Sequence, residues 1–231
     1  GNEKNKLCFF TNAFRCGKIK KIAHPPYQSK ISETSESSIY PILIGIGCFS
    51  FYKKEVVTMQ ILFFRHSMTA GNFERRYLGC KTDEPLCPEG IAFATQQAKQ
   101  ISFPLPEQVF VSPMRRCRET ASILFPNLKQ QIHPDLRECD FGMFEGKNYR
   151  ELSNCPEYQA WIDSGGTLPF PDGESREQFL TRSCAAVSEI VQTCNSDRIA
   201  IVAHGGTMMA VFSACEMHHK SYFDWKIPHC E

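Results

Sequence analysis

The sequence has no excess of charge of either sign and no hydrophobic run long enough to span a membrane. Its 231 residues carry 26 Lys and Arg against 25 Asp and Glu, so the formal net charge is +1. Proteins that bind nucleic acid or anionic membranes through their overall field carry a stronger net charge. We therefore expect no nucleic-acid and no membrane partner, and any bound anion must be held by a local group of donors.

The sequence also lacks clustered cysteines and any recognisable targeting segment. The most apolar stretch, residues 39–52, is shorter than the roughly 18 residues of a membrane helix and is interrupted by Pro41, Gly45 and Gly47. It has no clear cleavage site of a signal peptide. The 12 cysteines are scattered singly without a C-x-x-C pair, which favours small buried side chains in a reducing compartment over a disulfide framework or a zinc site. These absences predict a cytoplasmic protein.

Residues 1–58 differ in pattern from the rest of the chain. They show neither a helical nor an alternating period, and "KKEVVT" before Met59 can be encoded by a purine-rich run that resembles a bacterial ribosome-binding site. We predict that Met59 is the natural start, that residues 1–58 are an N-terminal extension outside the catalytic fold, and that residues 59–231 form one domain. The chain stops soon after an aromatic segment, which suggests that the fold is truncated at its C-terminal end.

From Met59 onward, short apolar runs alternate with helical periods, as in an α/β domain. Buried strands are predicted over residues 60–64, 108–111 and 198–202, and helices over 88–101, 112–124, 175–194 and from about 207. Ser112 and Pro113 are expected to cap the second helix and to form its first turn. Ser175 and Gln178 form a capping box at the start of the third.

Two of the predicted strands are each followed by a histidine. His66 comes after Arg65 at the end of the first strand, and His204 precedes Gly205 and Gly206 after the last. In an open parallel sheet, ligands bind beyond the carboxyl ends of the strands, where helix N-termini favour anions. The two glycines would allow the backbone to approach a bound group closely. The pattern predicts an anion site that contains both imidazoles.

Four motifs in order carry a resemblance to a known family. The segments "RHSMTAGNFERRYLGCKTDEPLCPEG", "SPMRRCRETA", "LRECDFGMFEG" and "IVAHGG" resemble the signature of the histidine phosphatase superfamily, also called phosphoglycerate mutase-like. The resemblance implies a three-layer α/β/α fold with a mostly parallel central sheet. "RYLGCKTDEPLC", "ECDFGMFEGKNYREL" and "YQAWIDSGGTLPFPDGES" are most similar to the α-ribazole phosphatase group of cobalamin biosynthesis. A small phosphomonoester is the implied substrate, and the implied assembly is a monomer or a homodimer.

The resemblance also implies roles for the residues that match the family's motifs. His66 is the implied nucleophile, which becomes phosphohistidine, and Arg65 and Arg116 are expected to make forked contacts with the phosphate oxygens. His204 is expected to complete the site as a donor. Glu138 is the implied proton donor to the leaving oxygen, and afterwards the base that activates water.

Further contacts are expected around the phosphate. Asn72 would add an uncharged amide, Gly205 would allow close approach, and Thr69 is expected to brace the loop more than to touch phosphate. Four donors aimed at one phosphoryl group can replace a metal ion, so we expect no metal and no cofactor. Ser67 departs from the family's pattern, which has glycine after the nucleophile, and this adds a hydroxymethyl group near the site.

Some assignments stay open at this stage. Asp140 and Glu145 are weaker rivals to Glu138 for the acid role, and Arg76 or Arg75 could be either an ion-pair partner or a substrate contact. Three aromatic residues could stack on a flat base or belong to the core: Tyr158, Trp161 and Phe170. Five histidines match no motif and are interpreted as surface or structural residues: His24, His133, His218, His219 and His229.

Three classes of function compete. The first is hydrolysis of a phosphomonoester, with α-ribazole 5′-phosphate as the expected substrate. The second is phosphoglycerate mutase-type transfer. It is disfavoured because only 66 residues (204 − 138) separate Glu138 from His204, which leaves little room for a lid that shields phosphoenzyme from water. The third is a non-catalytic phosphate-binding module, which is disfavoured by the full set of motif residues. Within the first class, a broad-specificity sugar phosphatase remains an alternative.

Overall fold

The computed structural model describes residues 11–12, 41–44, 48–52, 58–101, 104–215 and 229. Its centre is one sheet with the strand order β1-β2-β3-β4-β7-β5-β6. The strands are β1 (Thr11–Asn12), β2 (Pro41–Ile44), β3 (Cys48–Tyr52), β4 (Thr58–Arg65), β5 (Gln108–Val111), β6 (Gln130–Ile132) and β7 (Arg198–Ala203). The helices are α1 (Ala70–Phe73), α2 (Pro88–Gln100), α3 (Arg115–Leu124), α4 (Pro156–Asp163), α5 (Arg176–Thr193) and α6 (Gly205–Cys215), with 3₁₀ turns at Pro134–Leu136 and Gly142–Phe144.

Strands β4, β7, β5 and β6 are parallel neighbours. Strand β7 lies between β4 and β5, and its register with β4 pairs Ala203 with Arg65. The two strands that precede the predicted site histidines therefore end side by side. This arrangement confirms the expected α/β class with a parallel central sheet.

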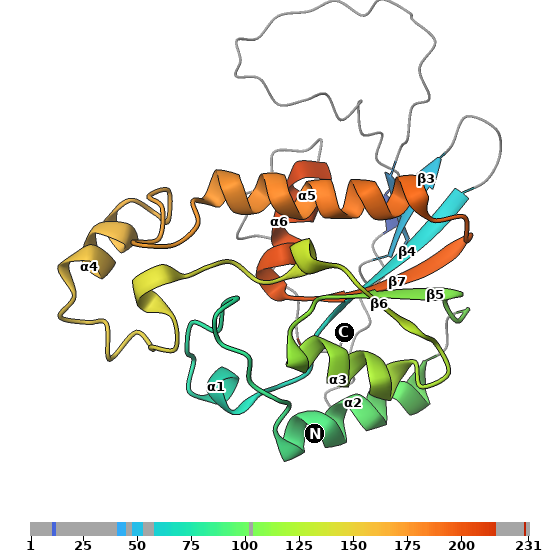
Figure 1. Ribbon diagram of the computed structural model, residues 1–231, viewed down its shortest axis with the longest axis horizontal. Coiled ribbons are helices and arrows are strands. Elements are labelled where there is room, and N and C mark those ends of the chain that lie inside the picture. The colour runs from blue at the N-terminus through green and yellow to red at the C-terminus, as the bar shows by residue number, and fades with distance from the viewer. Residues whose placement is uncertain are drawn as a thin grey trace, which may run out of the picture.

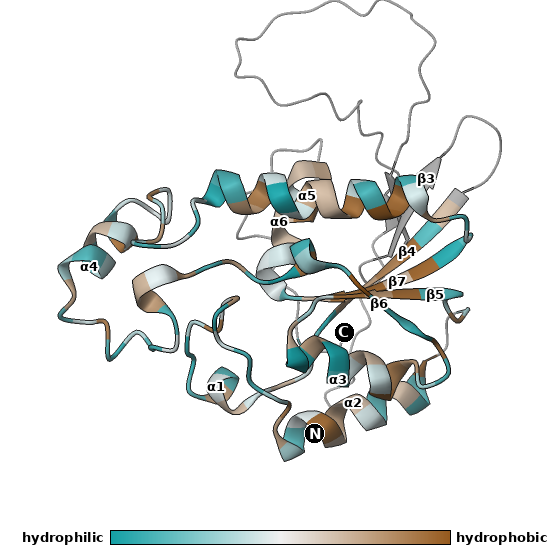
Figure 2. Ribbon diagram, viewed as in Figure 1, coloured by the Kyte–Doolittle hydropathy of each residue, from teal (hydrophilic) through white to brown (hydrophobic). Residues whose placement is uncertain are grey.

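Helices cover both faces of this sheet (Figure 1). Alternate strand residues such as Ile61, Phe63 and Ile201 pack on one face, against residues of α5 and α6. Their neighbours Leu62 and Val202 pack on the other face, against α3 and Phe125. The middle of the sheet is accordingly hydrophobic along the strands (Figure 2), because a parallel sheet that is buried on both faces needs apolar side chains in both directions.

The helix starts agree with the sequence in two cases. The Ser175 N–H donates to Gln178 Oε1 at 2.8 Å, and the Gln178 N–H donates to Ser175 Oγ at 3.1 Å, which confirms the capping box. Helix α2 begins after Cys87, whose Sγ accepts from the Gly90 N–H at 3.3 Å. The thiol thus caps the helix in place of a hydroxyl.

The start of α3 differs from the prediction. The helix begins at Arg115 with Met114 as its N-cap residue, so the expected cap at Ser112 and first turn at Pro113 are wrong. The physical reason is that the Ser112 hydroxyl bonds His204 at 2.7 Å, while its contact with the helix start is only a longer bond from the Met114 N–H at 3.4 Å. Ser112 therefore contributes its hydroxyl mainly to the site histidine and is not the N-cap residue of α3.

Strand β3 pairs antiparallel with β4, from Cys48 opposite Leu62 to Tyr52 opposite Thr58. Residues of the segment 1–58 thus extend the sheet along β4, although the sequence of that segment shows no strand pattern. The domain boundary at Met59 stays a prediction. Among the described residues, no helix is both long and apolar enough to cross a membrane.

Candidate functional site

The paired ends of β4 and β7 hold the two site histidines. The His66 N–H continues the ladder by donating to the Ala203 carbonyl at 2.9 Å. The imidazole rings of His66 and His204 lie 5.2 Å apart between centroids, and the two residues are only 4% and 0% exposed. The sheet therefore brings together the imidazoles that the sequence predicted to meet.

The ring of His66 has a defined orientation and proton position. Its Nδ1 lies 2.7 Å from the Ser67 carbonyl oxygen. A carbonyl can only accept, so Nδ1 carries the proton and Nε2 carries the lone pair. Burial, followed by the positive charge of Arg116, holds the pKa of His66 well below its usual range. The ring is therefore neutral near pH 7, and Nε2 can act as a nucleophile.

The ring of His204 is held by a partner at each nitrogen. The Arg116 Nε–H donates to Nδ1 at 3.3 Å, so Nε2 carries the proton and donates to Ser112 Oγ at 2.7 Å. The buried Cys117 Sγ lies 3.5 Å from Nε2. Burial and the charge of Arg116 also keep the pKa of His204 well below its usual range. Both ring nitrogens are used within the protein, and donation from His204 to phosphate stays a prediction.

Arg116 is fully buried, at 0% exposure. Besides His204, its guanidinium donates to three carbonyls of one loop: Thr82 O at 2.7 Å, Leu78 O at 3.0 Å and Gly79 O at 3.1 Å. The side chain thus fixes residues 78–82 next to the two histidines. A forked contact between Arg116 and phosphate stays a prediction, and it would require some of these donors to change partners.

Glu138 is buried at the N-terminus of α6. Its Oε1 accepts from the Cys139 N–H at 3.0 Å, and its Oε2 accepts from the Gly206 N–H at 3.1 Å. Burial raises the pKa of Glu138 more than these N–H groups and the charges of Arg116 and Arg65 lower it. A Cβ at position 206 would collide with Oε1, so a glycine is needed for this contact. A buried carboxyl with a raised pKa is suited to donate a proton.

Arg65 and Gly205 are also in contact. A Cβ at position 205 would lie 3.2 Å from Arg65 Nε, so the absence of a side chain lets the guanidinium lie against the start of α6. Burial lowers the pKa of Arg65, and the charge of Glu138 opposes this effect. The structure therefore gathers Arg65 with His66, Glu138 and His204, as the motifs predicted.

The loop after His66 is held by its own polar residues. Asn72 Oδ1 accepts from the Thr69 N–H at 3.0 Å and from its Oγ1 at 3.2 Å, so Thr69 braces the loop. Ser67 Oγ donates to the Gly90 carbonyl at 2.7 Å, and the residue has no exposed surface. The hydroxyl of Ser67 thus ties the loop to α2, and contacts of Thr69 and Asn72 with phosphate stay predictions.

Arg76 is an ion-pair partner in the structure. Its Nε contacts Glu74 at 2.5 Å and its Nη1 contacts Glu151 at 2.7 Å. A further donor bond from Nη1 reaches the Gly146 carbonyl. These contacts join the loop of residues 74–76 to that of 146–151, which favours the structural alternative for this arginine.

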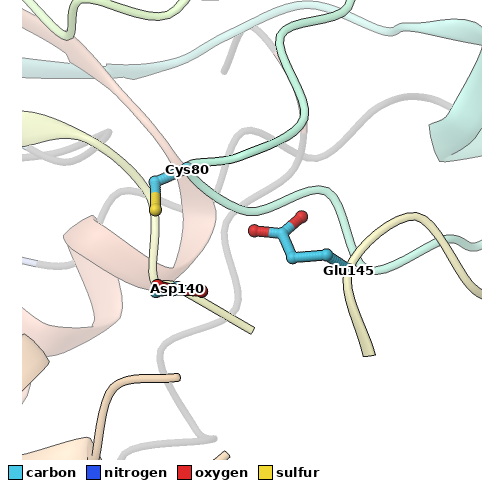
Figure 3. A group of neighbouring side chains, drawn as sticks. All are labelled: Cys80, Asp140 and Glu145. Atoms are coloured by element: carbon cyan, nitrogen blue, oxygen red, sulfur yellow. The ribbon is translucent and has the colours of Figure 1, made fainter. Parts of the chain in front are cut away.

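Within the described residues, one group could hold a metal ion by its spacing: Cys80, Asp140 and Glu145 (Figure 3). Asp140 pairs with Lys81 Nζ at 2.9 Å and accepts from the Gly142 N–H at 2.9 Å. Glu145 accepts from donors of one loop: Gly79 N, Lys81 N and Thr82 Oγ1. The carboxylates of Asp140 and Glu145 are thus engaged in holding loops together, and the acid role of Glu138 stays a prediction. The absence of a bound metal stays a prediction.

Sequence reasoning missed two residues of the site. Ser112 was interpreted as a helix cap, although its place at the end of β5 follows the same rule that identified His66 and His204. His229 matched no motif, yet its Nδ1 lies 2.9 Å from the His66 carbonyl oxygen and its ring is 5.3 Å from that of His66. No local pattern around position 229 signals this contact. The expectations for His24, His218 and His219 lie outside the described residues.

The chain resembles known proteins in sequence and in structure. A sequence model of the histidine phosphatase superfamily (branch 1) matches residues 61–231. Phosphoglycerate mutase-like protein 4 of Arabidopsis thaliana is 30% identical over 173 residues, which cover 70% of this chain and 73% of that protein. The metal-independent phosphoserine phosphatase of the same plant is 28% identical over 169 residues, or 69% and 70% of the two chains. The solved structure of the α-ribazole phosphatase from Shigella flexneri has a TM-score of 0.66 at 22% identity, over 74% of this chain and 87% of that one, and this likeness concerns the fold.

Proposed function

Because the chain belongs to the histidine phosphatase superfamily, we propose that it is a phosphomonoesterase that works without a metal through phosphohistidine at His66. The observation that carries the proposal is the bond from His66 Nδ1 to the Ser67 carbonyl. It leaves Nε2 with its lone pair, on a neutral ring that lies beside Arg65. A neutral imidazole is a competent nucleophile toward phosphorus near pH 7 and is also a good leaving group.

The reaction proceeds in two transfers. In the first, His66 Nε2 attacks phosphorus in line with the ester oxygen, and Glu138 gives its proton to the departing alcohol. In the second, the Glu138 carboxylate takes a proton from water, which attacks the phosphohistidine and releases phosphate and neutral His66. Arg65 and the backbone donors at the start of α6 supply positive potential for the phosphoryl oxygens.

The substrate that the motifs favour is α-ribazole 5′-phosphate. Six rings form an aromatic cluster, namely Tyr77, Phe141, Phe144, Tyr158, Trp161 and Phe170. Trp161 stacks with Phe170, at 5.0 Å between ring centroids, and with Tyr158, at 6.5 Å. Only Phe144 is fully buried, while the other five rings are partly exposed. Tyr77 directly precedes the loop that Arg116 holds, so the cluster adjoins the site and offers flat apolar surface to a nucleobase.

A screen of phosphate release tests this assignment. The substrates are α-ribazole 5′-phosphate, phosphoserine, 3-phosphoglycerate and fructose 2,6-bisphosphate, with His66→Ala as the blank. We expect the highest kcat/KM for α-ribazole 5′-phosphate, and Trp161→Leu should raise KM for it by about tenfold, the loss of one stacking contact, without affecting phosphoserine. A preference for phosphoserine in the unaltered protein would overturn the substrate. Isomerisation of 3-phosphoglycerate faster than its hydrolysis would replace the phosphatase with the mutase alternative.

A further inference from the structure

His229 is a second imidazole in contact with the nucleophile His66. Its Nδ1 lies 2.9 Å from the His66 carbonyl oxygen, which can only accept, so Nδ1 carries the proton and donates. The two rings meet edge to face, 5.3 Å apart at an angle of 63°. Burial and then the charge of Arg65 lower the pKa of His229 to about 4, so the ring is neutral near pH 7 and keeps this one donor.

The bond from His229 holds one edge of the peptide between His66 and Ser67. The other edge of the same peptide is its N–H group, on Ser67, which donates to Thr120 Oγ1 at 2.9 Å. Thr120 is fully buried, and its hydroxyl donates onward to the Arg116 carbonyl at 2.7 Å. The peptide plane is therefore fixed on both sides, by α3 through Thr120 and by His229.

The orientation of this peptide controls the nucleophile. Rotation of the plane changes ψ of His66 and φ of Ser67, and so it moves the Ser67 carbonyl relative to the His66 ring. That carbonyl is the acceptor that keeps the proton of His66 on Nδ1. If it moves away, the proton can shift to Nε2, and the nitrogen that must attack phosphorus loses its lone pair.

We propose that His229 is a positioning residue that fixes the 66–67 peptide and thereby holds His66 with its Nε2 unprotonated and aimed at the phosphorus. This role rests on the proposed function of His66 as the nucleophile. It acts through the backbone of His66 and assigns no contact between His229 and substrate. The two imidazoles thus bond successive carbonyls, His229 that of residue 66 and His66 that of residue 67.

Three variants of the full chain distinguish a role of Nδ1 of His229 from a role of its Nε2. Asn places its amide N–H near the position of Nδ1, Gln places its amide near Nε2, and Ala removes both. We expect His229→Ala and His229→Gln to slow phosphorylation of His66 by about tenfold or more, since small misplacements of a reacting group carry costs of this order. His229→Asn should stay within about threefold of the unaltered protein. KM should change little in all three.

The matched control is His133→Asn, at a histidine whose Nδ1 accepts from the Asp135 N–H at 3.3 Å, a role that Asn retains. His133→Asn should leave the burst rate, which is the rate of phosphorylation of His66, unchanged. Long-range ¹H–¹⁵N spectra of the resting protein report the tautomer of His66 without any turnover. They should show the proton on Nδ1 in the unaltered protein and in His229→Asn, and a mixture of tautomers in His229→Ala.

Two results would overturn the positioning role. One is a burst rate of His229→Ala that lies within twofold of the burst rate of the unaltered protein. The other is rescue by Gln but not by Asn, which would assign the function to Nε2. A third result would contradict the nucleophilic role of His66 and not the positioning role of His229. In that case the unaltered protein would form no phosphohistidine, while the tautomer spectra would still distinguish the variants.

Discussion

Replacement of Glu138 by Gln tests the acid role with little change in volume. The carboxylate accepts from two backbone N–H groups, those of Cys139 and Gly206. The amide of Gln can accept only one of them, and a buried N–H left without a partner costs about 1–3 kcal/mol. This loss is smaller than the 5–15 kcal/mol stability of a typical domain, so we expect Glu138→Gln to remain folded.

The effect on rate should depend on the leaving group. An alkyl phosphate leaves as a strongly basic alkoxide that needs a proton, so Glu138→Gln should slow its cleavage by roughly 10²–10⁴, or about 3–5 kcal/mol of barrier. The nitrophenolate of p-nitrophenyl phosphate is a weak base and leaves unaided. Phosphorylation of His66 by this substrate should be much less affected, so a burst of nitrophenolate should survive.

The assay follows the release of nitrophenolate by stopped flow. Cleavage of an alkyl phosphate is measured in quenched samples. Hydrolysis of phosphohistidine should remain slow in Glu138→Gln, because the same carboxylate activates the water. Phosphoenzyme should therefore accumulate, and it must be trapped without acid because phosphohistidine is acid-labile. Gly206→Ala should show the same dependence on the leaving group, since a Cβ there would displace Oε1 of Glu138.

Glu145→Gln is the matched control. Its carboxylate holds the loop of residues 79–82, so the change should lower thermal stability without altering the ratio of the two rates. Equal slowing of the alkyl and the aryl substrate in Glu138→Gln would show that Glu138 is not the proton donor to the leaving oxygen. Asp140 and Glu145 would then be the carboxylates to examine.

Four further predictions concern the nucleophile, the metal, the pH dependence of stability and the domain boundary. His66→Ala should lower kcat more than about a hundredfold, since loss of a nucleophile costs several kcal/mol of barrier, with an unchanged circular dichroism spectrum; retained turnover would contradict covalent catalysis. Prolonged dialysis against a chelator should leave activity intact, and a loss that added metal restores would disprove metal independence. The lowered pKa values of His66, His204 and His229 mean that the unfolded chain binds more protons below about pH 6.5, so the urea midpoint should fall as pH decreases. The raised pKa of Glu138 acts in the opposite sense, with stability lost as pH rises, so Glu138→Gln should steepen that fall. A chain that begins at Met59 should melt cooperatively and hydrolyse substrate at an unchanged rate, and failure of either would place residues 1–58 within the catalytic fold.

The sequence was informative wherever a local pattern had one physical cause. Buried strands gave continuous apolar runs, so β5 was predicted with the bounds that the structure has, and β7 differs by one residue. The start of α5 was signalled by Ser175 and Gln178, whose reciprocal bonds are local. Short elements such as α1, α4 and β6 were not predicted, because segments of three to eight residues are too short to show a clear hydrophobic period.

Several residues of the site could be predicted from the sequence, but the hydrogen bonds between them could not. The motifs pointed to His66, Glu138 and His204, and the rule for parallel sheets explains why the two histidines meet. No motif indicates whether a hydroxyl will bond to the start of a helix or to an imidazole. The sequence alone therefore assigned Ser112 the wrong role. His229 reaches the site from a part of the chain without any regular pattern, and only the folded structure places it there.

Strand β7 lies between β4 and β5 although it follows both of them in the sequence. A nascent chain that has left the ribosome only as far as α5 therefore carries two hydrophobic strands whose common neighbour has not yet been made. Parallel pairing that must wait for a late segment slows folding and leaves strand edges open to aggregation. His204 comes after β7, so the histidine pair is assembled only once translation has passed that residue. The site that the two histidines form therefore cannot exist before β7 has been made, and until then β4 and β5 lack the strand that pairs with both of them.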